Sequence, residues 1–310
     1  MFAFILRLSA IFIALLVMAE VAWAGDAAQT GAPVAAPVAA AVGAPVGTAI
    51  GAPADALADA PADAPAEAAP AATVLTRMEA QEAHQGVTND AKYVYAISNS
   101  TIGKYDRASG RHVASWSGDP QVFIHINSCE MVAGQMVCAM SNFPNVPMTS
   151  SVEWFNPVTM RHVRSHSFGP GHGSLTWIDW HDGFWWACFA NYTASGGEVG
   201  RGTESTRLVK YSPDFVERES WLFPLDVLKR FGDFSASGGR WGRDGMLYVT
   251  GHTRPEMYVL RLPDAGGRLV HVRTITLPTG GQAFDWDATR PGTIWTISRD
   301  KAELVQSRLP

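Results

Sequence analysis

The sequence has few cysteines, a low content of charged residues and none of the short motifs that mark the common catalytic chemistries. It contains three cysteines in 310 residues, and charged side chains make up 17% of it. The HxH and HExxH spacings of metal sites, the GxSxG of serine hydrolases and a glycine-rich phosphate loop are all missing. We therefore expect no metal, no cofactor and no enzyme built on these motifs.

Long hydrophobic runs are also missing after the first residues of the chain. The apolar run Leu8–Met18 follows a single charge at Arg7 and is shorter than the ~20 residues that span a bilayer. Small residues at Ala22 and Ala24 fit the cleavage site of a signal peptidase. These features predict a signal peptide over residues 1–24 and a periplasmic or secreted protein with no membrane span after cleavage. An uncleaved membrane anchor is the competing interpretation.

Residues 25–72 consist almost wholly of Ala, Pro, Gly and Val. Proline at this frequency opposes helix formation, and such small side chains cannot offset the entropy lost on ordering. The segment is predicted to be a disordered, extended linker. Its acidic residues account for the whole formal charge of −5, because Arg7 and Glu20 cancel: Asp26, Asp55, Asp59, Asp63 and Glu67. The remainder, residues 73–310, is nearly neutral without a basic stripe, so no nucleic-acid partner is expected.

One strand pattern occurs five times after the linker, each time behind a turn of the type that β-hairpins need. The copies are Lys92–Ser98, Gln135–Ser141, Phe184–Ala190, Met246–His252 and Thr293–Arg299. Each copy is followed by a third strand, and four of them by a fourth. Repeat starts spaced by roughly 43 to 62 residues are typical of propeller blades. The pattern predicts an all-β domain, a five-bladed β-propeller, over residues 73–310.

The fifth copy lacks a fourth strand, and Thr73–Glu79 stands alone before the first copy with the composition of a strand. We expect this N-terminal segment to close the ring as the outer strand of the last blade, which would cover an unpaired edge. A six-bladed propeller is the alternative, if Phe223–Phe234 conceals a degenerate blade. We favour a short helix there, because a proline precedes apolar residues at helical spacing.

Cys129 and Cys138 flank a predicted hairpin turn at Ala133-Gly134. Counting outward from the turn places them directly opposite each other, where antiparallel strands lie closest. A disulfide and a pair of core thiols are both compatible with this placement. Cys188 lies in an aromatic strand and is expected to be a buried small hydrophobe.

Polar residues recur at two equivalent points of the repeats, both expected at the mouth of the central channel. The starts of the inner strands carry Gln85, Ser128, Thr176, Ser237 and Gln282, and the ends of the second strands carry Asn99, Asn142, Asn191, His252 and Arg299. One explanation for these polar residues is that the channel mouth of any propeller is exposed to water. The long loops 142–150 and 191–206 on the same face favour binding instead.

The same face is expected to receive His125 and His172, so that three histidines, one arginine and several amides share one rim. We expect this rim to bind a small polar ligand, a peptide or a glycan. The alternative is a hydrolase, lyase or cyclotransferase with His172 or His252 as the catalytic acid or base. A scaffold for protein partners is a third possibility, and it would bind through the sides of the blades.

The segments YDRASGRHV (Tyr105–Val113) and WFNPVTMRHV (Trp154–Val163) resemble the turns of secreted bacterial propellers of the YncE-like and NHL-type group. The fragment Ser237–Asp264 is similar to a blade of the propeller-type glutaminyl-peptide cyclotransferases, as are HQG at His84–Gly86 and LTW at Leu175–Trp177. Both resemblances imply a propeller fold. The acidic residue that the cyclotransferases carry ahead of Trp-Gly has no counterpart here, so only the fold is carried over.

Overall fold

The computed structural model describes residues 69–310. The predicted signal peptide, 1–24, and the predicted linker up to residue 68 lie outside the described residues. Within the described part the only α-helix is α1 (Leu225–Phe231), and no helix has the length and hydrophobicity needed to cross a bilayer.

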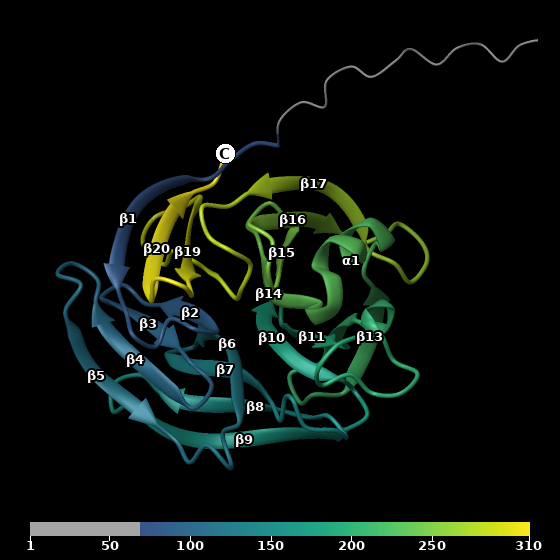
Figure 1. The fold of residues 1–310 in the computed structure, drawn as a ribbon, viewed down its shortest axis with the longest axis horizontal. Coiled ribbons are helices and arrows are strands. Elements are labelled where there is room, and N and C mark those ends of the chain that lie inside the picture. Colours follow the sequence, from purple (N-terminus) through teal and green to yellow (C-terminus); the bar gives the residue numbers. More distant parts are fainter. Residues whose placement is uncertain (1–68) are drawn as a thin grey trace, which may run out of the picture. The chain divides into compact units, whose positions relative to one another are not determined.

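Twenty strands form five four-stranded antiparallel sheets, arranged around a common axis as the blades of a propeller (Figure 1). The first blade contains β2 (Gly86–Asn89), β3 (Tyr93–Ile97), β4 (Thr101–Asp106) and β5 (His112–Ser117). The second contains β6 (His125–Val132), β7 (Gln135–Ser141), β8 (Thr149–Asn156) and β9 (Arg161–Pro170). The third contains β10 (Ser174–His181), β11 (Phe184–Ala190), β12 (Arg207–Tyr211) and β13 (Glu217–Leu222).

The fourth blade contains β14 (Ala236–Trp241), β15 (Leu247–Gly251), β16 (Glu256–Arg261) and β17 (Val270–Thr276). The fifth contains β18 (Asp285–Trp286), β19 (Thr293–Ser298), β20 (Glu303–Arg308) and, from the other end of the domain, β1 (Thr73–Glu79). β1 pairs antiparallel with β20 from Thr73 opposite Arg308 to Glu79 opposite Glu303. The predicted five-bladed fold and its closure by the N-terminal strand are both confirmed.

The segment Phe223–Phe234 is helical and does not form a sixth blade. Pro224 stands at the N-cap of α1, where its missing N–H costs no hydrogen bond, and Gly232 follows the helix with a positive φ of 68°. The helix buries Val227, Leu228 and Phe231 in the apolar cluster between the third and fourth blades. Two short 3-10 turns, Thr203–Ser205 and Gly232–Phe234, complete the helical part.

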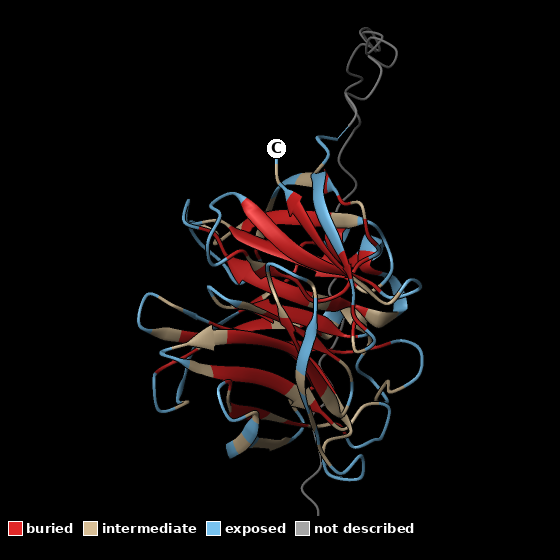
Figure 2. Ribbon diagram, turned by 90° about the vertical axis from the view of Figure 1, so that its left-hand side faces the viewer, coloured by how far each residue is buried: buried red, intermediate tan, exposed pale blue. Residues whose placement is uncertain are grey.

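The outermost strand of each blade has at most one buried residue, whereas the strands inside it are largely buried (Figure 2). All four residues of β2 are buried, whereas β5 at the outer edge of the same blade has none. The apolar side chains fill the spaces between neighbouring blades, where Trp177 of β10 packs against Gly239 of β14. A Cβ atom at Gly239 would lie 2.3 Å from the Trp177 ring, so only glycine allows this approach.

Cys129 and Cys138 are directly opposite each other in the β6–β7 pair and form a disulfide. This settles the choice that the sequence left open between a disulfide and two thiols. Cys188 is a free thiol and is fully buried, as expected.

Candidate functional site

A cavity of about 240 Å³ lies on the axis, on the face where the inner strands begin. We call it the rim cavity. Every blade contributes one polar side chain from the start of its inner strand, namely Gln85, Asn127, Thr176, Ser237 and Gln282. The rest of the lining comes from the first residue of β6, His125, and from the connections on the same face: Phe143, Tyr192, Ser195, Phe234, His252 and Arg299. Six of the lining residues are ones that the repeat pattern selected. Of the other six, His125 was expected on this face, and the remaining five were not selected.

Irregular strand pairing explains why polar side chains face the axis at the starts of three inner strands. The pairing of β10 with β11 skips Thr176, and the pairing of β14 with β15 skips Ser237. Both residues are extra residues of β-bulges, which redirect a side chain away from its alternating position. The β6–β7 pair also has a bulge, between Ile126 and Cys129.

The bulge in β6 decides which of two neighbouring residues lines the cavity. Asn127 faces the cavity and donates a hydrogen bond from its Nδ2 to the carbonyl oxygen of Leu175, 3.0 Å away. Ser128, the residue selected by aligning the repeats, is fully buried and is not part of the lining. Equal spacing between repeats cannot reveal an extra residue of this kind.

The two long loops expose an aromatic residue to the cavity because the preceding asparagine holds the loop. Asn142 bridges its loop, donating to the carbonyl oxygen of Pro147 at 3.0 Å and accepting from the Thr149 N–H at 2.8 Å. Phe143 then points into the cavity. Asn191 donates to the Ser205 carbonyl oxygen at 3.1 Å, and Tyr192 lines the cavity after it.

Five rings form a continuous wall on one side of the cavity, and we call this wall the aromatic arc. It runs through His125, Phe143, Tyr192, Phe234 and His252, with centroid separations between successive rings of 5.0, 5.3, 6.4 and 4.9 Å. The rings offer flat apolar surface, while the inner strands offer hydrogen-bonding groups. No Asp or Glu is found among the lining residues that the structure describes, and Arg299 supplies a positive charge.

Arg299 and His252 form one polar unit at the end of the arc. The Arg299 guanidinium donates to the Nε2 of His252 at 3.2 Å, which leaves Nδ1 as the protonated nitrogen, 3.2 Å from the Thr253 hydroxyl. Burial and the charge of Arg299 lower the pKa of His252. His252 is therefore neutral near pH 7, which suits a hydrogen-bonding group or a general base.

His125 is held neutral more strongly. Burial, followed by the charge of Arg299 and the proximity of His252, lowers the pKa of His125 to about 4. Its ring packs against Phe143 and behaves as a polar member of the arc.

Two other predicted site residues are not part of the lining: Asn99 lies next to Gln85, whereas His172 lies away from the rim cavity, among residues of β9, β11 and β12. Asn99 accepts a hydrogen bond from the Nε2 of Gln85 at 2.8 Å and so fixes the orientation of that amide. His172 packs against Phe168 and Phe189, and its Nδ1 lies 3.2 Å from the Arg207 guanidinium. Burial and Arg207 lower the pKa of His172.

Beneath the rim cavity, four buried charged side chains fill the axis, and we call them the axial cluster: Glu130, Asp179, Arg240 and Asp285. Each lies three positions after a polar rim residue in its own inner strand. Nε of Arg240 lies 3.2 Å from the Asp285 carboxylate and 3.8 Å from that of Asp179. The guanidinium also donates to the carbonyl oxygens of Ile178 and Cys129, so it connects three inner strands.

The axial cluster contains more carboxyl groups than its single arginine can neutralise. Burial, followed by the charge of Asp179, raises the pKa of Glu130 well above its ordinary value. The raised pKa favours the protonated form of Glu130, whose Oε1 accepts the N–H of Trp180 at 2.7 Å. Within residues 69–310, no three His, Cys, Asp or Glu side chains are grouped so that they could hold a metal ion.

No protein-family model and no curated protein matches the sequence. Among solved structures, a chain of the mitotic checkpoint complex aligns with 82% of this chain and 97% of its own length, at 10% identity and a TM-score of 0.45. The luciferin-regenerating enzyme aligns with 76% of this chain and 94% of its own, at 10% identity and a TM-score of 0.45. The hydrazine synthase of Kuenenia stuttgartiensis aligns with 72% and 70%, at 12% identity and a TM-score of 0.42. At such identities and scores, these likenesses say nothing about activity or ligand.

Replacing Gly281 by alanine is expected to lower the free energy of unfolding by about 1–3 kcal/mol, the range for overpacked positions. The new Cβ would lie 2.2 Å from the carbonyl oxygen of Gly251, which is backbone and cannot rotate away. Gly267→Ala is the matched control, because a Cβ there meets nothing within 4 Å. Urea unfolding of both variants measures the difference, and equal midpoints would contradict the packing at Gly281.

Proposed function

We propose that the protein binds a small polar ligand, or the end of a peptide or glycan chain, in the rim cavity. The observation that carries the proposal is the convergence of one polar side chain from each of five blades on a cavity walled by the aromatic arc. Ligand sites commonly combine apolar walls with a few fixed polar groups in this way. Gln85, whose amide is held by Asn99 at 2.8 Å, is one of these fixed polar groups.

The charge of the lining narrows the ligand class. Arg299 is the positive group in a lining without Asp or Glu, so the ligand is expected to carry a carboxylate or several hydrogen-bond acceptors. A flat or apolar part of the ligand would pack against Phe143 and Tyr192. N-acetylated amino acids combine these features and are suitable first probes.

Thermal shift and calorimetric titration with N-acetylated amino acids, their amides, and mono- and disaccharides test the proposal. A probe that binds the rim cavity should lose roughly ten-fold in affinity with Arg299→Gln, because a charge-assisted hydrogen bond contributes about 1.5–3 kcal/mol. Tyr192→Ala should also weaken it, whereas Arg218→Gln on the exposed strand β13 serves as the control. The proposal fails if no probe binds, or if binding is unaffected by both rim substitutions.

A hydrolase, lyase or cyclotransferase acting in the same cavity is the second candidate. The observation in its favour is His252, a neutral imidazole beside an arginine in the lining. For any substrate identified, replacing His252 by alanine should abolish turnover and leave binding largely intact. The same substitution at His172 separates the two histidines that the sequence selected. Unchanged turnover in both variants would exclude this candidate.

We also propose that the protein acts outside the cytoplasm, in the periplasm or beyond. The disulfide between Cys129 and Cys138 supports this location, because such bonds form and persist in oxidising compartments. The turn motifs at Tyr105–Val113 and Trp154–Val163 support a relationship with secreted YncE-like and NHL-type propellers. A partner protein bound to the outer strands is compatible with a rim that holds a ligand.

A further inference from the structure

A second cavity, of about 280 Å³, lies at the opposite ends of the inner strands, between the fourth and fifth blades. We call it the far-face cavity. It is bounded by the turn after β14 and by the connection from β18 to β19. Its lining consists of residues 242–244 and 290–293 together with Tyr248, Trp286 and Asp287. None of these residues belongs to the rim cavity.

Two aromatic rings form its walls, and their own polar atoms are already satisfied. Tyr248 and Trp286 pack edge to face, with centroids 5.0 Å apart. The indole N–H of Trp286 donates to the carbonyl oxygen of Trp241 at 2.9 Å, and the Tyr248 hydroxyl donates to Asp244 at 2.8 Å. The two rings therefore present only apolar surface to the cavity, which suits a flat hydrophobic group.

One buried polar group in the lining has no partner. The Thr293 side chain is fully buried at the start of β19, and its hydroxyl forms no hydrogen bond with any described residue. An unsatisfied buried hydroxyl costs about 1–3 kcal/mol, so such groups are uncommon in folded proteins. A ligand in the cavity would supply the missing partner.

Two arginines carry positive charge at the opening. Arg243 and Arg290 are exposed, and neither guanidinium forms an ion pair or a hydrogen bond with another residue of the described chain. Of the two carboxylates in the lining, Asp244 accepts from Tyr248 and from the Met246 N–H.

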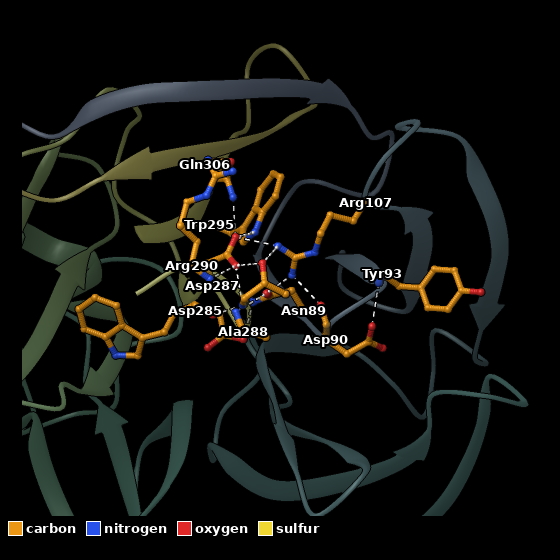
Figure 3. Close-up of polar contacts among 12 residues, drawn as sticks. Asn89, Asp90, Tyr93, Arg107, Asp285, Asp287, Ala288, Arg290, Trp295 and Gln306 are labelled. Carbon is orange, nitrogen blue, oxygen red and sulfur yellow. Dashed lines mark hydrogen bonds and ion pairs between the residues drawn. The ribbon is translucent and has the colours of Figure 1, made fainter. Parts of the chain in front are cut away.

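Asp287, the other carboxylate, is neutralised from the neighbouring blade (Figure 3). Its Oδ2 lies 2.7 Å from Arg107 and 2.8 Å from the indole nitrogen of Trp295, while its Oδ1 accepts the N–H of Arg290. Burial opposes ionisation, but the hydrogen bonds from Thr289 and Gln306 and the charge of Arg107 outweigh it and lower the pKa of Asp287 to about 2. With Asp287 paired to Arg107, the opening keeps the charges of Arg243, Arg290 and Asp244, whose sum is positive.

We propose that the far-face cavity is a second binding site, specific for small aromatic carboxylates. The aromatic part of the ligand lies against Trp286 and Tyr248, the carboxylate faces Arg243 and Arg290, and Thr293 hydrogen-bonds to a polar atom of the ligand. This site does not depend on the function proposed for the rim cavity.

Isothermal titration of the folded protein with indole-3-acetate, and with its neutral analogue indole-3-acetamide, tests the proposal. The carboxylate is expected to bind at least ten-fold more tightly than the amide. Arg243→Gln and Arg290→Gln should each weaken its binding about five-fold, since exposed charge pairs contribute up to about 1 kcal/mol each. Thr293→Val should weaken both probes by a similar factor, and its urea midpoint shows whether the fold is intact.

Two controls locate the effect. Arg218→Gln on β13 should leave the affinity for indole-3-acetate unchanged, and in Arg299→Gln, which removes the positive group of the rim cavity, the binding that depends on Arg243 and Arg290 should persist. The proposal is overturned if the two probes bind equally, if the double variant Arg243→Gln/Arg290→Gln binds like wild type, or if millimolar indole-3-acetate gives no binding heat. Loss of binding with Arg299→Gln alone would assign the probe to the rim cavity and would also overturn it.

Discussion

Replacing Arg240 by methionine is expected to lower the free energy of unfolding by about 3–5 kcal/mol, the cost of removing one partner from a buried ion pair. Arg240 is only 2% exposed, and its guanidinium is the positive group between the carboxylates of Asp179 and Asp285. Without it, these carboxylates would be left buried without a counter-charge. Urea unfolding monitored by circular dichroism measures the loss.

Two further variants separate charge from packing in the axial cluster. Arg218→Met removes an exposed arginine of β13 and should change stability by less than about 0.5 kcal/mol, as for other surface substitutions. Adding Asp179→Asn and Asp285→Asn to Arg240→Met should recover much of the lost stability, because the uncompensated charges disappear. A triple variant no more stable than Arg240→Met would show that packing, and not charge, dominates.

Replacing residues 73–79 by a flexible Gly/Ser segment is expected to cost at least about 4 kcal/mol and to cause self-association. The loss combines the hydrogen bonds of six register pairs with β20, at about 0.5–1.5 kcal/mol each, with the burial of Met78. It also leaves β20 as an unpaired edge, which favours pairing with another chain. Urea unfolding and light scattering after size-exclusion chromatography measure the two effects.

The control for this prediction replaces two exposed side chains of β1 and keeps the rest of the strand, whereas the Gly/Ser segment removes every side chain that favours a strand. Val74 and Leu75 are 37% and 38% exposed, so replacing both by serine should cost less than about 1 kcal/mol and leave the elution volume of the wild-type protein unchanged. If the Gly/Ser variant is as stable as this control and has the same molar mass by light scattering, ring closure does not depend on β1.

The fold could be predicted from the sequence because its signals are local and repeated. Each blade carries its own turn residues and alternating pattern, and Thr73–Glu79 is a strand with no partner nearby in the chain. The helix at Leu225–Phe231 follows from a proline and helical spacing, which are also local. The disulfide could be predicted only as far as the register, because two opposite cysteines are compatible with either redox state.

The site could be predicted only in part, because its details depend on irregularities that local patterns do not show. The repeats select Thr176 and Ser237, which line the rim cavity, but the bulge in β6 places Asn127 there in place of Ser128. The repeat pattern did not predict the aromatic arc, because it selects the polar residues Asn142 and Asn191. The residues that line the cavity are the aromatic ones that follow them, Phe143 and Tyr192. A polar residue followed by an aromatic at the start of a long loop was the available signal.

The axial cluster was missed because its members lie far apart in the chain and meet only when the ring closes. Arg240 and Asp285 are separated by 45 residues. From the sequence, Asp179 and Asp285 are expected to be carboxylates that cap turns. Asp287 does cap a turn, because its Oδ1 accepts the backbone N–H groups of Thr289 and Arg290. Nothing near Arg240 in the chain indicates that three carboxyl groups approach it.

The axial cluster also determines whether the ring is open along its axis. With its side chains almost inaccessible to solvent and joined to several inner strands, it closes the bore of the ring between the two faces. The rim cavity is therefore closed at its base, and a ligand bound there would enter and leave through the same opening. The two faces of the ring are therefore not connected along its axis.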